Sequence, residues 1–144
     1  MSTHSTGYSG TPLPKKLGIR PGHRVLLVNV PDSIVLEPAL LDDVDVARST
    51  DLTIPVGPYD VILALCRDAA TMFGCFPALK ACLQPSSALW LGWLKQASGG
   101  PTDLTEDGVR SHGLRYGLVD VKICAVDAQW SGLKFVYRIV DRPR

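Results

Sequence analysis

The sequence predicts an α/β fold, a three-layer sandwich whose mostly parallel sheet of about six strands is closed by an antiparallel strand pair. Nearly continuous apolar runs alternate with segments of helical periodicity, which is the pattern of a parallel sheet with crossover helices on its faces. The last two apolar runs are joined by a short turn, so they should pair antiparallel. With 144 residues, 46% of them hydrophobic, the chain is long enough to bury a substantial core.

The strands are predicted as short apolar runs bounded by turn residues. We place them over Arg24–Val30, Val44–Ala47, Tyr59–Cys66, Ala88–Leu94, Leu118–Val126 and Leu133–Val140. The first, third and fourth runs are the most continuously apolar, so we expect them to be adjacent parallel strands at the centre of the sheet. Irregular chain is expected over Asp51–Pro58, and Asp127–Gly132 should turn the chain between the last two strands.

Two short helices are predicted in the first third of the chain. Leu13–Leu17 should form one of them, and Gly18 suits its carboxyl end because glycine readily adopts the left-handed conformation found there. After the first strand, Asp32 or Ser33 is placed to cap a brief helix that runs through Glu37 and is limited by the proline that follows.

A longer helix is predicted over Ala69–Leu83, where large apolar residues recur with helical spacing. Asp68 precedes it and is a favourable N-cap. Gly74 and Pro77 lie inside the same pattern, and we expect a kink or a break at that point.

A further helix is predicted over Leu104–Tyr116. Asp103 stands three residues before Glu106, which is the spacing of a capping box with Asp103 as the N-cap. Gly117 suits the position just beyond the carboxyl end of this helix.

Composition narrows the classes of function. The formal net charge is +1 and no basic block occurs, so nucleic acid is not expected as a partner. No segment resembles a signal peptide or approaches the ~20 apolar residues of a membrane helix, so we expect a cytoplasmic protein without a membrane partner. Residues 1–14 should form a loose arm ahead of a single domain over residues 15–144.

The cysteines and histidines do not predict a metal site. None of the four cysteines forms a C-x-x-C pair, and no histidine has metal-ligand spacing with them. We expect the cysteines to be small buried hydrophobic residues in a reducing compartment.

A ligand site is expected where the parallel strands end, because ligands of such sheets bind outside the carboxyl ends, near the point where strand order reverses. The candidate binding residues are Asn29, Arg67, Asp68, Lys95, Ser98, Thr102 and Asp103. Lys95 directly follows the fourth strand and is the first residue there that could bring a charge to the crevice. Several of them also have a structural interpretation. Asp68 could simply cap its helix, and Asn29 could only satisfy buried backbone groups. Arg67 could be solvated or form an ion pair, and Lys95 could pair with an acid.

The turn after the first strand argues against a nucleotide-type cofactor. Sites for dinucleotides and S-adenosylmethionine (SAM) need glycines there, so that the backbone can approach the ligand closely. The turn over residues 29–33 contains no glycine, and Pro31 lacks a backbone N–H donor. The second strand also lacks a clear ribose-binding acid at its end, with Asp51 a few residues beyond. We therefore predict no cofactor.

Two resemblances add to this interpretation. A parallel sheet finished by a short antiparallel pair resembles the methyltransferase variant of the Rossmann fold, so we expect a Rossmann-like sandwich. The sequence also resembles a bacterial family catalogued only as a domain of unknown function, through the motifs YSGTPL (8–13), KLGI (16–19), ASG with TDLTED (97–107), GLVDVK (117–122) and WSGLK (130–134). That family transfers no activity. Its Trp-Pro-Lys-Lys after the fourth strand is here Trp93-Leu94-Lys95-Gln96.

Three hypotheses of function follow. The first is a non-catalytic Rossmann-like module that binds a small molecule or a protein partner at the carboxyl ends of the strands, which the missing glycines favour. The second is a divergent SAM-dependent methyltransferase-like enzyme, which the closing strand pair favours. The third is a structural or assembly protein, in which the polar amino-terminal arm packs on a neighbour. The sequence leaves open whether the chain is an enzyme and what its oligomeric state is.

Overall fold

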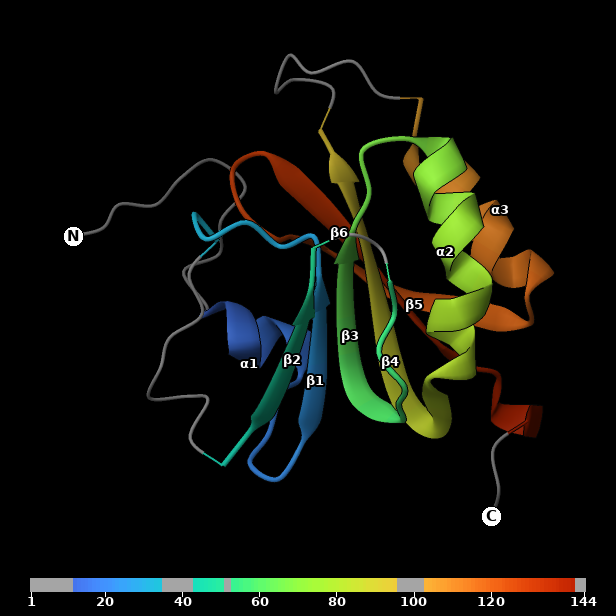
Figure 1. Ribbon diagram of the computed structural model, residues 1–144. Coiled ribbons are helices and arrows are strands. Elements are labelled where there is room, and N and C mark those ends of the chain that lie inside the picture. The colour runs from blue at the N-terminus through green and yellow to red at the C-terminus, as the bar shows by residue number, and fades with distance from the viewer. Residues whose placement is uncertain (1–11, 35–42, 51–52, 96–102, 142–144) are drawn as a thin grey trace.

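The computed structural model describes residues 12–34, 43–50, 53–95 and 103–141, and Figure 1 shows their arrangement. The helices in these parts are α1 (Leu13–Leu17), α2 (Ala69–Ala81), α3 (Glu106–Arg115) and a short 3₁₀ helix, η3 (Ile139–Asp141). The strands are β1 (Arg24–Val28), β2 (Asp45–Ser49), β3 (Tyr59–Leu65), β4 (Leu83–Leu94), β5 (Leu118–Ala125) and β6 (Trp130–Tyr137). Residues 35–37 of the brief helix predicted through Glu37 lie outside the described residues. The same is true of Asp51.

The strands form one six-stranded sheet in the order β2-β1-β3-β4-β6-β5. The pairs β1–β2, β1–β3 and β3–β4 are parallel, while β6 runs antiparallel to both β4 and β5. The predicted Rossmann-like α/β class, the central parallel trio and the closing antiparallel pair are therefore confirmed. The chain passes from β1 to β2 on one side and returns to β3 on the other, so strand order reverses between β1 and β3.

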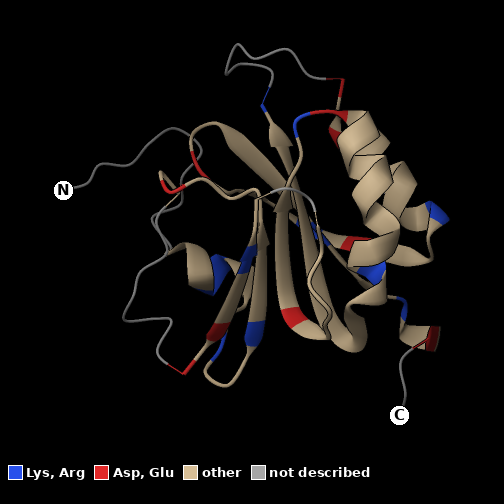
Figure 2. Ribbon diagram, in the orientation of Figure 1, with Lys and Arg blue, Asp and Glu red and all other residues tan. Residues whose placement is uncertain are grey.

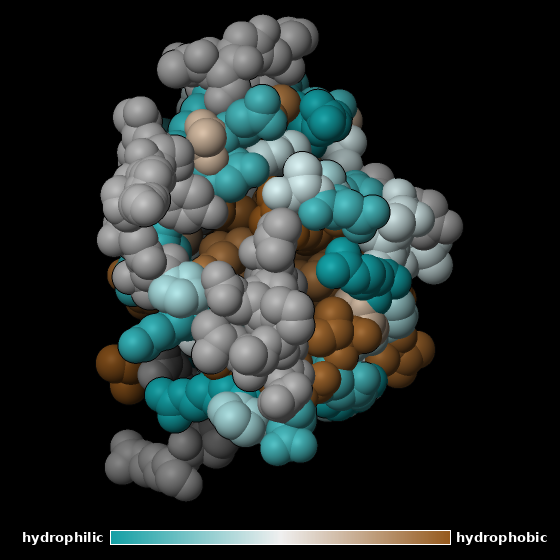
Figure 3. All heavy atoms as spheres, turned by 90° about the vertical axis from the view of Figure 1, so that its left-hand side faces the viewer, coloured by the Kyte–Doolittle hydropathy of each residue, from teal (hydrophilic) through white to brown (hydrophobic). Residues whose placement is uncertain are grey.

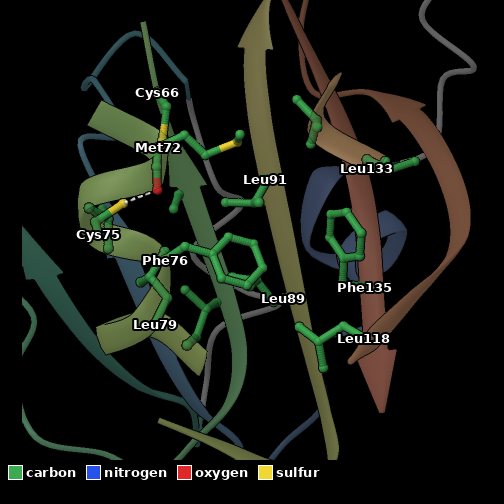
Figure 4. Packing of buried hydrophobic residues seen from close by; sticks show 14 of the residues in the cluster. Cys66, Met72, Cys75, Phe76, Leu79, Leu89, Leu91, Leu118, Leu133 and Phe135 are labelled. Atoms are coloured by element: carbon green, nitrogen blue, oxygen red, sulfur yellow. Dashed lines mark hydrogen bonds between the residues drawn. The ribbon is translucent and has the colours of Figure 1, made fainter. Parts of the chain in front are cut away.

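Helices lie on both faces of the sheet, with α2 and α3 on one face and α1 on the other (Figure 1). Each face has its own hydrophobic cluster, because successive side chains of a strand point to opposite faces. Leu26 and Ile62 belong to the cluster on the side of α2, and Leu27 and Leu63 to the cluster on the side of α1. Figure 4 shows Phe76 of α2 reaching toward β4 within the first cluster.

Strand β4 begins at Leu83, five residues before the predicted start at Ala88. Leu83 pairs with Tyr59, and the register with β3 then shifts before Ala88 pairs with Val61. Ser87, which is 1% exposed, bridges this irregularity, because its hydroxyl accepts from Gln84 N–H (2.9 Å) and donates to Tyr59 C=O (2.6 Å). This tertiary hydrogen bonding extends a strand whose polar start gave no strand signal.

The last strand, β6 (Trp130–Tyr137), lies three residues closer to the amino terminus than the predicted Leu133–Val140. β6 starts at Trp130, which pairs with Leu94, so the turn predicted over Asp127–Gly132 is present but ends at Gln129. The carboxylate of Asp127 accepts from the backbone N–H groups of Gln129 and Trp130, both at 2.8 Å, and closes a tighter turn.

Helix α2 does not break, so of the kink or break predicted at Gly74 and Pro77 the break is wrong. It runs from Ala69 to Ala81 through both Gly74 and Pro77. Phe76 and Leu79 on its inner face are fully buried against the sheet, which holds the helix together where propensity would end it.

The surface on the side of α1 and β2 mixes hydrophilic with hydrophobic residues (Figure 3). Among the described residues, no helix has the length and apolar character needed to cross a membrane.

Candidate functional site

A cavity of about 310 Å³ opens at the carboxyl ends of β1 and β3, where strand order reverses. It is lined by Asn29, Pro31, Leu65, Arg67, Asp68, Thr71 and Trp130. Its volume lies near the lower end of the ~300–1,000 Å³ typical of ligand pockets. Its position is the one that the physics of open parallel sheets favours for a ligand.

The turn after β1 shapes one wall of the cavity. Asn29 adopts a left-handed conformation (φ 57°), which ends β1 at Val28 rather than at the predicted Val30. Its N–H donates to Ser49 C=O at the end of β2 (2.8 Å), and the Pro31 ring lines the cavity directly. The turn here therefore lacks the glycines with which it usually approaches a nucleotide-type ligand, and neither Asn29 nor Pro31 offers it a backbone donor.

Trp130 and Arg67 also line the cavity. Trp130 is the first residue of β6 and is only 5% exposed. The Arg67 guanidinium carbon lies 5.7 Å from the centre of a Trp130 ring, within the range of a cation–π interaction. Sequence analysis missed Trp130 because it placed this residue in a turn, whereas its pairing with Leu94 brings it to the end of the parallel strands.

Two carboxylates occupy the amino end of α2 beside the cavity. Asp68 accepts from Thr71 N–H (2.7 Å), and interaction with the Thr71 side chain, together with this backbone hydrogen bond, lowers the pKa of Asp68. Asp103 accepts from Ala69 N–H, also at 2.7 Å. Asp103 therefore does not cap α3 as predicted. The N-cap of α3 is Thr105, which has an extended backbone conformation and whose hydroxyl accepts from Gly108 N–H (3.1 Å).

Lys95 is not among the residues that line the cavity. Its backbone N–H donates to Gln129 C=O (2.9 Å) and its ammonium donates to Asp127 C=O (3.2 Å), so the turn before β6 holds both. The structure thus brings Asn29, Arg67 and Asp68 together at the cavity. Asp103 lies beside them, where its carboxylate contacts the amino end of α2. Ser98 and Thr102 lie outside the described residues.

Cys66, at the end of β3, is not an exposed nucleophile. It is 1% exposed, and interaction with the neighbouring Cys75 thiol, together with burial, raises its pKa. Because the thiolate is the reactive form, Cys66 is an inert thiol. The part of the chain that the structure describes holds no group of three or more His, Cys, Asp and Glu side chains arranged to bind a metal ion.

The contact between Asp103 and α2 gives a stability prediction. We expect Asp103→Ala to lower the free energy of unfolding by about 1 kcal/mol, the usual cost of a lost helix cap. The amide of Ala69, rather than that of Gly108, should lose protection from hydrogen exchange, as NMR would show. Asp107→Ala is the matched control, because the Asp107 side chain is 95% exposed and should cost less than about 0.5 kcal/mol. Loss of protection at Gly108 in Asp103→Ala would contradict the assignment.

No protein-family model matches the sequence, and no curated protein matches it in sequence. Solved structures do match the fold. A SAM-dependent methyltransferase from Aquifex aeolicus superposes with a TM-score of 0.56 at 16% identity, covering 84% of this chain and 85% of that one. Magnesium protoporphyrin IX methyltransferase (ChlM) from Synechocystis PCC 6803 with bound SAH gives 0.58 at 14% identity, covering 87% and 78%. The glycopeptide N-methyltransferase MtfA complexed with SAM gives 0.55 at 9%, covering 88% and 86%.

These likenesses show that the chain has the Rossmann-like fold of SAM-dependent methyltransferases. At such low identity they show the fold alone. The similarity to a bacterial family of unknown function stays a prediction, since it rests on the sequence motifs.

Proposed function

We propose that this chain is a binding module of methyltransferase fold, which holds a small molecule in the cavity between β1 and β3 without using SAM as a methyl donor. The observation that carries the proposal is the wall of that cavity. Pro31 lies where a glycine turn would approach the ligand, and the N–H of Asn29 already donates to Ser49 C=O. The cavity keeps the position of a ligand site while the backbone lacks the features of a SAM site.

The charges of the lining favour a ligand with a hydrogen-bond acceptor. Of the lining residues that the structure describes, Arg67 is the only cation, and a guanidinium offers five N–H donors. The carboxylates of Asp68 and Asp103 already accept from the N-terminal amides of α2. These amides are therefore not offered to an anion, and Arg67 is the group we expect to contact the ligand.

The second candidate is SAM-dependent methyl transfer, and the fold comparisons favour it. The neighbours include structures solved with SAM or SAH. The two candidates differ in whether this chain binds SAM, which calorimetry decides directly.

The proposed site is tested by NMR. Carboxylate, nucleoside and sugar fragments at ~1 mM, a level that half-fills a millimolar site, are added to ¹⁵N-labelled protein. We expect one class to shift the amides of Arg67 and Thr71 together with the Trp130 indole, because these groups line one cavity. Arg67→Ala should weaken that binding about tenfold, the loss expected for one charge-assisted hydrogen bond.

Lys95→Ala is the control, because its ammonium contacts the Asp127 carbonyl and not the cavity, so affinity should not change. Shifts confined to other surfaces, or equal affinity in Arg67→Ala, would contradict the proposed site.

A further inference from the structure

A second cavity lies at the opposite end of the sheet, at the amino ends of β1 and β3 and beside the carboxyl end of α1. It also measures about 310 Å³. It shares no described lining residue with the cavity at the carboxyl ends of the strands. Figure 2 shows residues of both charges gathered at the amino ends of β1, β2 and β3.

The polar lining of this second cavity is mainly cationic. Arg20 and Lys134 contribute two positive charges, His23 contributes an imidazole, and Ser86 a hydroxyl. Asp60 is the single acid of the described lining, and one of its carboxylate oxygens accepts from the backbone N–H of Arg24 (2.8 Å). The cavity therefore has an excess of hydrogen-bond donors with positive charge.

Lys134 is the least compensated of these groups. It is half-buried on β6, its ammonium lies 5.9 Å from the centre of a Trp90 ring, and it stands directly opposite Lys122 of β5. Like charges in directly opposed positions of paired strands destabilise each other. Burial, and then the charge of Lys122, lower the pKa of Lys134. Among the described residues no acid forms an ion pair with it.

His23 is oriented by a contact within the same loop. Its Nδ1 accepts from Arg20 N–H (3.1 Å), so in the neutral imidazole the proton lies on Nε2. His23 therefore offers a donor whether it is neutral or charged.

We propose that this cavity binds the phosphate group of a small phosphorylated molecule, with Arg20, His23 and Lys134 as its donors. A guanidinium, an imidazole and an ammonium together supply the charge-assisted hydrogen bonds that a phosphate accepts. A bound dianion also offsets the repulsion between Lys134 and Lys122. The volume leaves room for a small organic group beyond the phosphate.

The test titrates ¹⁵N-labelled protein with glycerol 3-phosphate and with inorganic phosphate, to ~10 mM at constant ionic strength, so that a millimolar site saturates without a change in screening. We expect saturable shifts at the amides of Arg20, His23, Ser86 and Lys134. Lys134→Gln and Arg20→Gln should each raise Kd at least about tenfold, since each removes a charge-assisted hydrogen bond. Tighter binding of glycerol 3-phosphate supports recognition of an organic phosphate, and equal binding supports recognition of the phosphate group alone.

Lys80→Gln is the matched control, because it removes the same charge from α2 on the other face of the sheet, and Kd should stay within about twofold. The proposal is overturned if the shifts fail to saturate or if both cavity variants keep the wild-type Kd. It is also overturned if acetate produces the same shifts with the same Kd. The readout residues differ from those at the carboxyl-end cavity, so either site can fail without the other.

Discussion

Gly113→Ala should lower the free energy of unfolding by about 2 kcal/mol, although alanine is the better helix former. Gly113 is in α3, where this change on an open surface would gain up to ~1 kcal/mol. Here a Cβ would overlap the Phe135 ring of β6, with Phe135 Cδ1 only 2.6 Å away. Phe135 is fully buried, so its ring cannot move aside, and overpacking costs up to ~3 kcal/mol.

Urea denaturation measures this effect, as a lower midpoint at an unchanged slope. Gly74→Ala is the matched control, since it is also inside a helix and an added Cβ would meet nothing within 4 Å. It should stabilise the protein by about 0.5–1 kcal/mol. If both variants gain stability, the close packing of α3 on β6 is wrong.

Stability should also fall as the pH drops below about 6.5, because of His112. This side chain is 6% exposed, and its Nε2 makes no hydrogen bond within the described residues. Its ring stacks on Phe73 at 4.3 Å and meets the edge of Phe76 at 4.9 Å. Burial first, and then the charge of Arg115, lower the pKa of His112.

The unfolded chain therefore takes up a proton near pH 6.5, while the folded protein takes it up only at lower pH. The stability is fully present above pH 6.5 and is lost as the pH falls toward the folded pKa, at up to about 1.4 kcal/mol per pH unit. Chemical denaturation at pH values from 7 to 5, in steps of about one pH unit, would show this slope in the free energy of unfolding. His112→Phe keeps the aromatic contacts and should remove it. A slope that persists in His112→Phe would contradict this origin.

The sequence predicted most of the fold, because nearly continuous apolar runs bounded by turn residues are typical of buried parallel strands. Leu63 and Leu91 sit in such runs, and both are central in the sheet. Element ends were less predictable, because they depend on contacts between distant residues. The start of β4 depends on the hydrogen bond from Ser87 to Tyr59, which no local pattern contains.

Only part of the candidate site could be predicted, because the rest of it also depends on contacts between distant residues. Asn29, Arg67 and Asp68 follow strands whose ends could be located from apolar runs, and they do line the cavity. Trp130 was missed because its place depends on the register between β4 and β6. Asp103 was assigned to the wrong helix, because capping spacing alone does not separate it from Thr105, and the fold places it beside Ala69.

The most direct test of the central claim is calorimetric titration of the protein with SAM at ~100 μM, a level that nearly fills a micromolar site. We expect no binding heat, because Pro31 lies in the cavity wall and the N–H of Asn29 is already bonded to Ser49. A one-to-one micromolar site for SAM that is weakened in Arg67→Ala would contradict the account and support methyl transfer instead.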